Sequence, residues 1–449
     1  MKGLSICIAT AGTLTLLNGC SAYKDQSNEL PNIILIMADD MGYETPGFNG
    51  GISYNTPVLD RLASEGIRFT NCYSQPLSTP SRVKMMTGMY NFRNYEHFGY
   101  LNPDEFTFGN LMQNAGYNTC IVGKWQLNGL NRNNPGNQDV TRPYYFGFDE
   151  YCLWQLHHSP AEGERYANPL ITQNGEDLPR VKDAYGPDVF SNFINDFIDR
   201  NADKKFFIYY PMVLPHDPFV PTPLSEAWAD STKRYQQDNM YFRDMIEYID
   251  LIIGRIEAKL NEKGLRENTL LIFVADNGTS QSIVSKTISG DVKGAKGLTV
   301  NTGNHVPLIA VWPKLIKQGR ICEHIISFAD FFPTFAQITG TDTVLLNSDG
   351  KSFYPILKGA RNMTQKEIFV HYSPRWGKFA HNRWVMDGKY KLYQDFSFYN
   401  TVQDPLEQNE LDILTPEEEN IRNRFDEIIQ EKEKKFPFKW NDESFNPEY

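Results

Sequence analysis

Unbroken apolar runs, each followed by polar residues, constrain the fold of this chain more than any other feature. The first run, Asn32–Asp40, is aliphatic from Ile33 to Ala38 and ends in two acids. A run that does not alternate with polar residues is typical of a strand buried on both faces of a parallel sheet. Four further runs predict strands of the same kind: Thr119–Val122, Phe206–Leu214, Thr269–Ala275 and Val306–Trp312.

Helical patterns lie between these strands. We expect helices at Asn55–Glu65, Pro80–Tyr90, Phe106–Asn114, Asp188–Asn201 and Asn239–Lys263, the last ended by Gly264. The alternation predicts an α/β fold with a mostly parallel sheet flanked by helices, over residues 31–350. Residues 351–449 predict a smaller α+β subdomain, with short strands at Ile368–Tyr372, Asn382–Met386 and Tyr390–Tyr393 and a charged helix at Pro416–Lys435.

The N-terminal residues are typical of a targeting segment. Lys2 precedes the apolar run Leu4–Leu17, which is shorter than the roughly 20 residues of a membrane span. Leu17-Asn18-Gly19-Cys20 resembles the lipobox of bacterial lipoproteins. This implies a signal peptide over residues 1–20, a lipidated Cys20 and a tether over residues 21–30. We therefore expect an exported lipoprotein, periplasmic or anchored to the outer membrane; a plain cleaved signal is the alternative.

Net charge and cysteine spacing exclude two classes of protein. The formal charge of −11 argues against a nucleic-acid-binding surface, so an anionic substrate would need a local basic pocket. The cysteines outside the leader form no CxxC pair and are irregularly spaced, which disfavours a zinc or redox site. We expect buried free thiols at Cys72, Cys120, Cys152 and Cys322.

Polar residues follow the predicted strands at the sheet edge where α/β folds bind ligands. Asp39-Asp40 and Asp276-Asn277 each end a strand, and Lys124 and His216 follow two others. Neighbouring acids would repel one another, and oxygen ligands of this type suit Ca²⁺ or Mg²⁺. A turn or a helix cap is the alternative for one Asp pair alone. Two such pairs on separate buried strands favour a cation site.

The segment SQPLSTPSRVKMMTG, residues 74–88, is crowded with hydroxyl groups. Thr79-Pro80 predicts a helix start with Thr79 as the N-cap, so Ser78 would lie just ahead of the helix. Arg82, four residues after Ser78, can reach back over the first turn. A hydroxyl, a guanidinium and a helix N-terminus together favour an anion. The residues alone thus predict an anion site with a metal.

The same segment carries a family resemblance. Ser78-Thr79-Pro80-Ser81-Arg82 matches the Cys/Ser-x-Pro-x-Arg signature of the type I, formylglycine-dependent sulfatases of the alkaline phosphatase-like superfamily. The likeness extends over nearly all of the chain after the leader. Further matching segments follow in family order: Ala38–Tyr43, Thr56–Ala63, Gly123–Trp125, Pro215-His216, Asp276–Gly278, Lys296-Gly297, His305–Pro307, Asp330–Thr334 and Asp349–Ser352.

The resemblance implies a chemistry. Ser78 would be oxidised to formylglycine (3-oxoalanine) by a separate Ser-type maturation enzyme, and the hydrated aldehyde would attack the sulfate sulfur. The implied metal ligands, for Ca²⁺ rather than Mg²⁺, are Asp39, Asp40, Ser78, Asp276 and Asn277. The implied catalytic groups are Ser78, Arg82, Lys124, Gln126, His216 and Lys296.

Three of these groups would balance negative charge in the transition state: Arg82, Lys124 and Lys296. His216 would bind sulfate or protonate the leaving oxygen. We favour Lys296 over Lys293, because Gly297 and the later His305-Val306-Pro307 fix the register.

One position departs from the family pattern. Gln126 stands in Gly-Lys-Trp-Gln where the family usually has histidine, and glutamine can form hydrogen bonds but cannot act as a base. His157 or His158 would then supply that function, while Gln126 could still contact the diol. We expect substrate contacts from His157, His158, Arg93 and His97. Other polar groups of the rim are expected to be solvated: Asn94, Arg165, Arg375, His381 and Arg383.

The favoured function is hydrolysis of sulfate esters of a sulfated carbohydrate. A two-zinc phosphatase is disfavoured, because the chain has only 8 histidines and no Asp-His pair. A phosphonate or phosphate ester hydrolase of the same superfamily stays open. A non-catalytic glycan-binding lipoprotein is the other alternative, and it applies if Ser78 is unmodified.

Overall fold

The predicted apolar runs form the centre of one large sheet. The computed structural model describes residues 30–129, 136–156, 165–179, 183–342, 347–361 and 366–437, and the chain from Pro31 on is one compact unit. All five predicted strands are confirmed: β1 (Asn32–Ala38), β3 (Asn118–Lys124), β7 (Phe206–Pro211), β8 (Thr269–Ala275) and β11 (His305–Val311). Every residue of β1, β7 and β8 is buried, as expected for strands covered on both faces.

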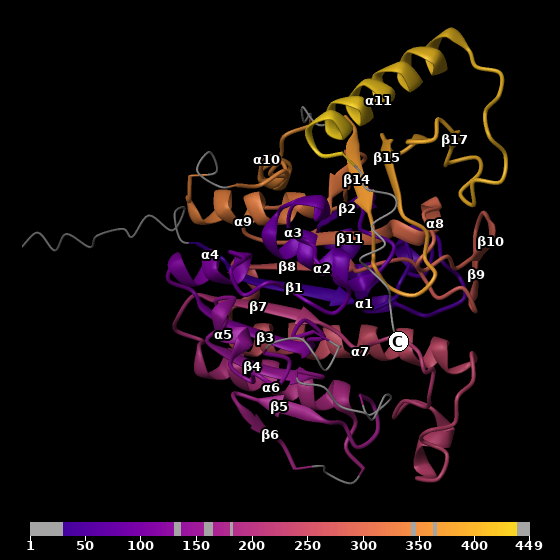
Figure 1. Cartoon of the computed structure of the whole chain (residues 1–449). Coiled ribbons are helices and arrows are strands. Elements are labelled where there is room, and N and C mark those ends of the chain that lie inside the picture. Colours follow the sequence, from indigo (N-terminus) through magenta and orange to yellow (C-terminus); the bar gives the residue numbers. More distant parts are fainter. Residues whose placement is uncertain are drawn as a thin grey trace, which may run out of the picture. The chain divides into compact units, whose positions relative to one another are not determined.

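The strand order is β12-β2-β11-β8-β1-β7-β3-β4-β5-β6, with β13 also paired to β2 (Figure 1). The central pairs β8-β1, β1-β7, β7-β3 and β3-β4 are parallel, whereas β11 runs antiparallel to both β8 and β2. The sheet is therefore mixed and mostly parallel at its centre. Its outer strands are β2 (Ile67–Tyr73), β4 (Glu150–Trp154), β5 (Ile171–Gln173), β6 (Glu176–Asp177), β12 (Arg320–Cys322) and β13 (Ile326–Ser327).

Helices pack in two groups. One group is α1 (Pro57–Glu65), α6 (Gly186–Arg200) and α7 (Tyr241–Glu262), and the other is α2 (Ser78–Thr87), α4 (Phe108–Asn114) and α9 (Phe331–Thr339). In α7, buried residues recur every three or four positions, so the helix has one apolar face. Shorter elements are α3 (Asn91–Asn94), α5 (Arg142–Tyr145), α8 (Asn301–Asn304), α10 (Tyr354–Leu357), 3-10 turns η2 (Gly47–Asn49), η3 (Glu226–Ala229), η4 (Arg266–Asn268) and η5 (Phe328–Asp330), and the hairpin β9 (Val284–Thr287)–β10 (Gly290–Lys293).

A second, antiparallel sheet follows, with the order β14-β15-β16-β17. It comprises β14 (Ile368–Tyr372), β15 (Asn382–Met386), β16 (Tyr390–Tyr393) and β17 (Phe398–Asn400), and α11 (Pro416–Lys435) packs on β15 and β16 (Figure 1). The capping box of Thr415 and Glu418 starts α11. The boundary at residue 350 stays a prediction.

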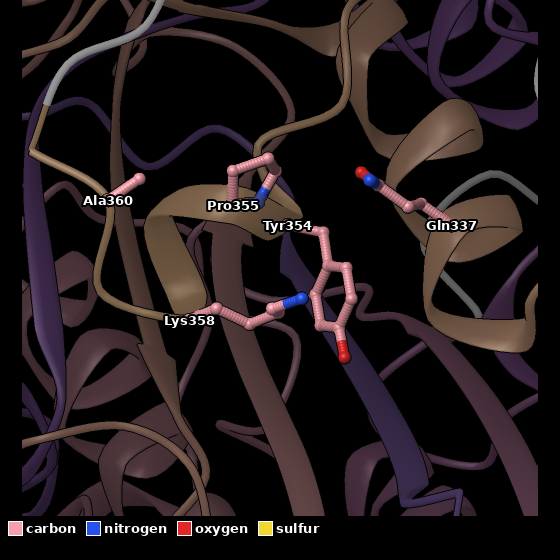
Figure 2. Close-up of a pocket in the computed structure, with 5 residues that line it drawn as sticks. All are labelled: Gln337, Tyr354, Pro355, Lys358 and Ala360. Atoms are coloured by element: carbon pink, nitrogen blue, oxygen red, sulfur yellow. The ribbon is translucent and has the colours of Figure 1, made fainter.

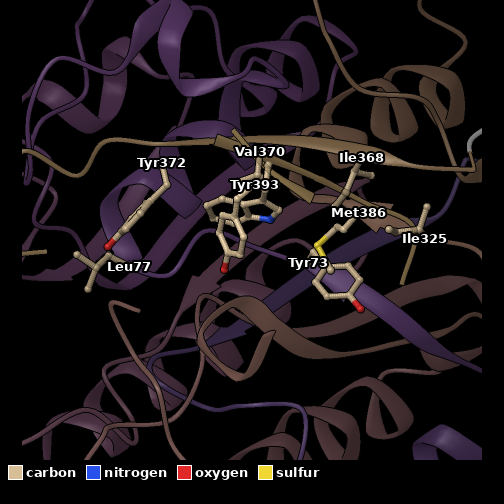
Figure 3. Packing of buried hydrophobic residues seen from close by; sticks show 9 residues of the cluster. Tyr73, Leu77, Ile325, Ile368, Val370, Tyr372, Met386 and Tyr393 are labelled. Atoms are coloured by element: carbon tan, nitrogen blue, oxygen red, sulfur yellow. The ribbon is translucent and has the colours of Figure 1, made fainter. Parts of the chain in front are cut away.

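The two faces of this small sheet have different neighbours, because side chains alternate along each strand. Phe369, Val385 and Leu392 face α11, where they pack with Phe425 and Ile429. The opposite face packs against Tyr73 and Leu77, the residues that lead into the predicted anion site (Figure 3). The small sheet is thereby joined to the segment that precedes Ser78.

Two expectations about composition can be compared with the described residues. Cys72, Cys120, Cys152 and Cys322 are free and buried, as expected. Among the helices described, none combines the length and the apolar character needed to cross a membrane. The leader and Cys20 lie outside the described residues, so export and lipidation stay predictions.

Candidate active site

The register of β1 and β8 brings the predicted acids together. Ala38 pairs with Ala275, so Asp39 and Asp276 leave the sheet side by side, and the Asp276 N–H donates to the Ala38 carbonyl oxygen (3.0 Å). The Asp40 N–H donates to Asp276 Oδ1 (3.0 Å). Asn277 Nδ2 donates to Asp40 Oδ1 (2.8 Å). All of these side chains are buried, as a functional cluster at the carboxyl ends of parallel strands would be.

Two lysines balance part of this negative charge. Lys124, the last residue of β3, places Nζ 2.9 Å from both carboxylate oxygens of Asp39. Lys296 places Nζ 2.6 Å from Asp40 Oδ2. Burial raises the pKa of Asp276 to about 7 and raises that of Asp40. Two ammonium groups therefore do not fully compensate three buried carboxyl groups.

His216 completes the cluster from the loop after β7. Its Nε2 lies 3.0 Å from Lys296 Nζ and 3.7 Å from Asp40 Oδ2. Burial, together with the charges of Lys296 and Arg165, lowers the pKa of His216 well below its usual value. The ring is therefore neutral near pH 7. Its Nδ1 is hydrogen-bonded to the Asp217 carbonyl oxygen, which places the proton on Nδ1 and leaves Nε2 to accept from Lys296.

The donor set fits a hard cation. Ligand atoms of Asp39, Asp40 and His216 lie within 4.8 Å of one another. Asn277 Oδ1 is buried and has no hydrogen-bond partner in the part of the chain that the structure describes. A buried carbonyl oxygen without a partner is costly, and a cation beside surplus carboxylates would satisfy it. Carboxylate and amide oxygens are the ligands that Ca²⁺ and Mg²⁺ prefer.

The start of α2 differs from the prediction. The helix begins at Ser78, and its N-cap is the extended residue Leu77, so the expectation that Thr79 is the cap is wrong. Thr79 Oγ1 instead accepts a hydrogen bond from the Gly99 N–H (3.1 Å). Ser78 thus belongs to the first helical turn, whose amides have no partner inside the helix and favour an anion.

Arg82 reaches back to Ser78 as predicted. Its Nε donates to Ser78 Oγ (3.1 Å), and Nη1 donates to the Trp125 carbonyl oxygen. Nη2 is buried, and no described residue accepts a hydrogen bond from it. A buried hydroxyl and a guanidinium with an unused donor therefore stand together, which suits a tetrahedral anion such as sulfate.

Gln126 is paired with a residue that sequence reasoning did not find. Its side-chain Nε2 donates to Gln155 Oε1, and its N–H donates to the Gln155 carbonyl oxygen (3.3 Å). Both residues have positive φ, 47° and 51°, so they lie in the left-handed region that side chains rarely adopt. His157 and His158 lie outside the described residues.

The predicted rim residues separate into two groups. Arg93 pairs with Asp349 (2.9 Å), and His97 stacks on Tyr100 (4.8 Å between ring centroids); neither Asp349 nor Tyr100 belongs to the acid cluster. Arg165 and Arg383 were expected to be solvated, but both are buried, which corrects that expectation. Arg383 pairs with Glu433 of α11.

Arg165 is a predicted rim residue whose charge acts on the candidate site. Its guanidinium lies 4.1 Å from the ring centroid of Trp154, a cation–π contact, and its charge lowers the pKa of His216. Its Nε and Nη1 atoms are buried and have no hydrogen-bond partner among the described residues. A lone arginine in a polar loop has no sequence pattern that reveals such burial.

The surface hollow of Figure 2 lies elsewhere. It has a volume of about 280 Å³ and is lined by Gln337, Tyr354, Pro355, Lys358 and Ala360. None of these is a predicted site residue, and Lys358 is its one charged group. The buried cluster around Asp39 is the better candidate, because it combines carboxylates, cations and a hydroxyl.

The sequence of this chain is similar to those of proteins with known families. The family profile described as Sulfatase matches residues 31–341, and the one described as N-sulphoglucosamine sulphohydrolase, C-terminal, matches residues 295–435. The N-acetylgalactosamine-6-sulfatase of Canis lupus familiaris is 29% identical over 378 residues, which are 76% of this chain and 68% of that protein.

Two solved structures share the fold. BT4656, in complex with its substrate D-glucosamine-2-N,6-O-disulfate, superposes with a TM-score of 0.73 at 22% identity, over 91% of this chain and 98% of that one. The phosphonate monoester hydrolase of Agrobacterium radiobacter gives 0.68 at 18% identity, over 90% and 96%.

The sulfatase profile spans most of the described residues, from β1 through α9. It includes the acids, both lysines, His216 and Ser78. The chain therefore belongs to the sulfatase family of the alkaline phosphatase-like superfamily, and it is a sulfuric ester hydrolase.

Proposed function

We propose that this enzyme removes sulfate from a sulfated carbohydrate by means of a formylglycine made from Ser78 and a divalent cation. The observation that carries the proposal is the buried contact between Ser78 Oγ and Arg82 Nε, next to a guanidinium nitrogen that bonds none of the described residues. Among the described residues, the side chain that bonds the Ser78 hydroxyl is an arginine, which cannot act as its base, so an unmodified hydroxyl would be a weak nucleophile.

Asp39, Asp40, Asp276 and Asn277, with the modified Ser78, would hold the cation, for which we propose Ca²⁺ rather than Mg²⁺. When bound, it would polarise the sulfate and lower the pKa of the hydrated aldehyde. The hydrated aldehyde would supply the hydroxyl that attacks sulfur, and its second hydroxyl would let the aldehyde form again as sulfate leaves.

The chain's own cations would bind the sulfate and complete the proton transfer. Arg82 and Lys124 would donate hydrogen bonds to sulfate oxygens as their charge grows. Burial opposes protonation of Lys296 most strongly, but the charges of Asp40 and Asp39 and the hydrogen bond to Asp40 together outweigh it, and the pKa of Lys296 is raised. Lys296 Nζ therefore carries the proton of the Lys296–His216 pair, and it is the proposed source of the proton that His216 Nε2 passes to the leaving oxygen.

The carbohydrate class is supported by the relatives. One is an N-acetylgalactosamine-6-sulfatase, and one neighbour was solved with a disulfated glucosamine as its substrate. The buried Arg165 beside His216 would suit a second anionic group of such a sugar. We also propose that a Ser-type maturation enzyme acts on Ser78.

Sulfate release from defined sulfated mono- and oligosaccharides tests the function. Protein produced with the maturation enzyme should release sulfate, whereas Ser78→Ala should fold normally and release none. Ser74→Ala is the matched control, because Ser74 is a buried serine that bonds only main-chain oxygens of the described residues, Gln75 and Asn304. Turnover by Ser78→Ala would contradict the proposal.

A phosphonate ester hydrolase is the second candidate, favoured by the likeness to the Agrobacterium enzyme. Adding a phenylphosphonate monoester to the same panel decides between them. Faster turnover of the phosphonate than of every sulfate ester would favour the second candidate.

Export and anchoring are proposed from Leu17-Asn18-Gly19-Cys20. In a bacterial host, the protein should fractionate with membranes, and Cys20→Ala should release it into the soluble periplasmic fraction. Equal fractionation of both proteins would contradict a lipid anchor.

A further inference from the structure

Three side chains of the small sheet hold the main chain next to Lys296. Tyr372 donates its hydroxyl to the Gly297 carbonyl oxygen (3.1 Å). The Tyr393 hydroxyl, which also contacts the Glu407 carboxylate, lies 3.0 Å from the Thr299 carbonyl oxygen, and Lys391 Nζ donates to that same oxygen. The three side chains, called the clamp below, come from β14 and β16, and all three are buried.

Burial of the Lys391 ammonium costs free energy, and an apolar side chain at this position would avoid that cost. The ammonium is fully buried, pairs with the buried Glu407 (3.0 Å), and lies 4.6 Å from the ring centroids of both Trp384 and Tyr393. Replacing a buried ion pair by apolar residues of similar volume is often neutral or stabilising, so packing alone does not explain it. An ammonium does, however, add a charge-assisted hydrogen bond to the Thr299 carbonyl oxygen, which an apolar side chain could not make.

The clamped loop is also fixed on its other side. The Lys296 N–H donates to the Thr279 carbonyl oxygen (2.9 Å), just after Asp276-Asn277. The Gly297 N–H donates to the Pro76 carbonyl oxygen (2.8 Å), just before Ser78. Gly297 has φ +84°, and a Cβ there would lie 2.0 Å from Phe379, so no larger residue fits. The loop thus lies between the acid cluster, the Ser78 segment and the small sheet.

The same face of the small sheet packs on the Ser78 segment. Tyr372 and Tyr393 belong to the apolar cluster that contains Tyr73 and Leu77, and Figure 3 shows Tyr372 with Leu77 in that cluster. One face of this sheet therefore touches both the N-cap residue of α2 and the loop that carries Lys296.

We propose that Tyr372, Lys391 and Tyr393 are positioning residues that hold Lys296 Nζ against Asp40 and His216, so that the C-terminal sheet is part of the catalytic apparatus. The proposal rests on the function proposed above for Lys296. A displacement of about 1 Å at a reacting group can cost about 100-fold in rate. Loss of one clamp hydrogen bond should therefore lower kcat, with KM little changed.

Tyr372→Phe tests the clamp with the least disturbance, because it removes one hydroxyl and keeps the ring. Tyr390→Phe is the matched control: its hydroxyl bonds Glu418 of α11 (3.1 Å), and Tyr390 packs on the opposite face of the same sheet. We expect Tyr372→Phe to lower kcat on a sulfated sugar about 10-fold, and Tyr390→Phe by less than about 2-fold.

A double-mutant cycle with Lys296→Ala separates positioning from a general structural role. The assay uses the sulfated sugar, whose leaving oxygen needs the proton, at an enzyme concentration high enough to measure the residual rate of Lys296→Ala. If the clamp acts through Lys296, Tyr372→Phe should cost less than about 2-fold in the Lys296→Ala background. Equal losses in both backgrounds, or no loss in either, would overturn the proposal.

Hydrogen exchange of the segment 294–304 gives a readout that does not depend on activity. Tyr372→Phe and Tyr393→Phe should speed exchange there, and Tyr390→Phe should not. Unchanged exchange in both clamp variants would refute the clamp. If the wild-type protein releases no sulfate from any ester while the exchange prediction holds, the proposed function fails and the clamp stands.

Discussion

Replacing Lys124 by methionine gives a quantitative test of the candidate site. Lys124 Nζ bonds both oxygens of Asp39, and the two side chains are only 3% and 1% exposed. Methionine keeps an unbranched side chain as far as the ε position but removes the ammonium, so Asp39 would face Asp40 and Asp276 without its counter-charge. Removing one partner of a buried ion pair costs about 3–5 kcal/mol, because the other charge is left uncompensated.

The loss should depend on a divalent cation. In chelator at pH 8, the free energy of unfolding of Lys124→Met should fall by about 3–5 kcal/mol relative to wild type. Calcium at a hundred times its Kd adds about 2.7 kcal/mol to any protein that binds it only when folded. At one fixed calcium concentration, Lys124→Met should gain more than wild type, because it should bind the cation with a lower Kd where the cation supplies the counter-charge that the lysine provided. Lys293→Met, in the exposed hairpin strand β10, should stay within about 0.5 kcal/mol.

Denaturant unfolding in chelator and in calcium measures both effects. Equal stability of Lys124→Met and wild type in chelator would refute the buried pair. Equal stabilisation of the two proteins by calcium would refute the interpretation of the acids as a cation site. Loss of kcat by about 100- to 1,000-fold is expected in parallel, as for other electrostatic groups that act on the transition state.

Two further predictions concern the helix that starts at Ser78. Burial lowers the pKa of Lys84 to about 8, below its ordinary value of 10.5, so its ammonium destabilises the fold fully below pH 8 and the penalty disappears as pH rises through about 10.5. Lys84→Met should therefore be more stable than wild type at pH 7, by at most about 3 kcal/mol, and equally stable near pH 11. Thermal unfolding at the two pH values measures the difference, and the same gain at both would contradict this prediction. Arg82→Lys keeps the charge but loses the Nε contact to Ser78, so steady-state kinetics should show kcat/KM reduced about 100-fold with little change in stability, and unchanged kinetics would contradict the assigned contact.

The parts of the fold that follow from local patterns were predictable. The apolar runs determine the central strands, and the acids that follow them meet because parallel strands end at one edge. The start of α2 was mispredicted, because Thr79-Pro80 matches the usual sequence of an N-cap residue followed by proline at the first helical position. Tertiary contacts instead favour a start at Ser78. Leu77 is buried in the apolar cluster under the small sheet, and the Thr79 hydroxyl accepts a hydrogen bond from the Gly99 N–H.

Other parts depend on contacts between distant residues and had no local signal. Strands β2 and β4 mix polar and apolar residues, so their sequences do not stand out. The clamp joins residues 75 to 94 positions apart, and tyrosine or lysine in a short strand does not reveal such a partner. The burial of Arg165 against Trp154 is likewise a tertiary effect.

Mass spectrometry of the peptide that carries Ser78 tests the central claim most directly. Protein purified from a host with a Ser-type maturation enzyme, and shown to release sulfate, should contain a Ser78 residue that lacks a pair of hydrogens and reacts with an aldehyde-trapping reagent. Conversion should rise in step with specific activity between preparations. An intact serine in a fully active preparation would contradict the account.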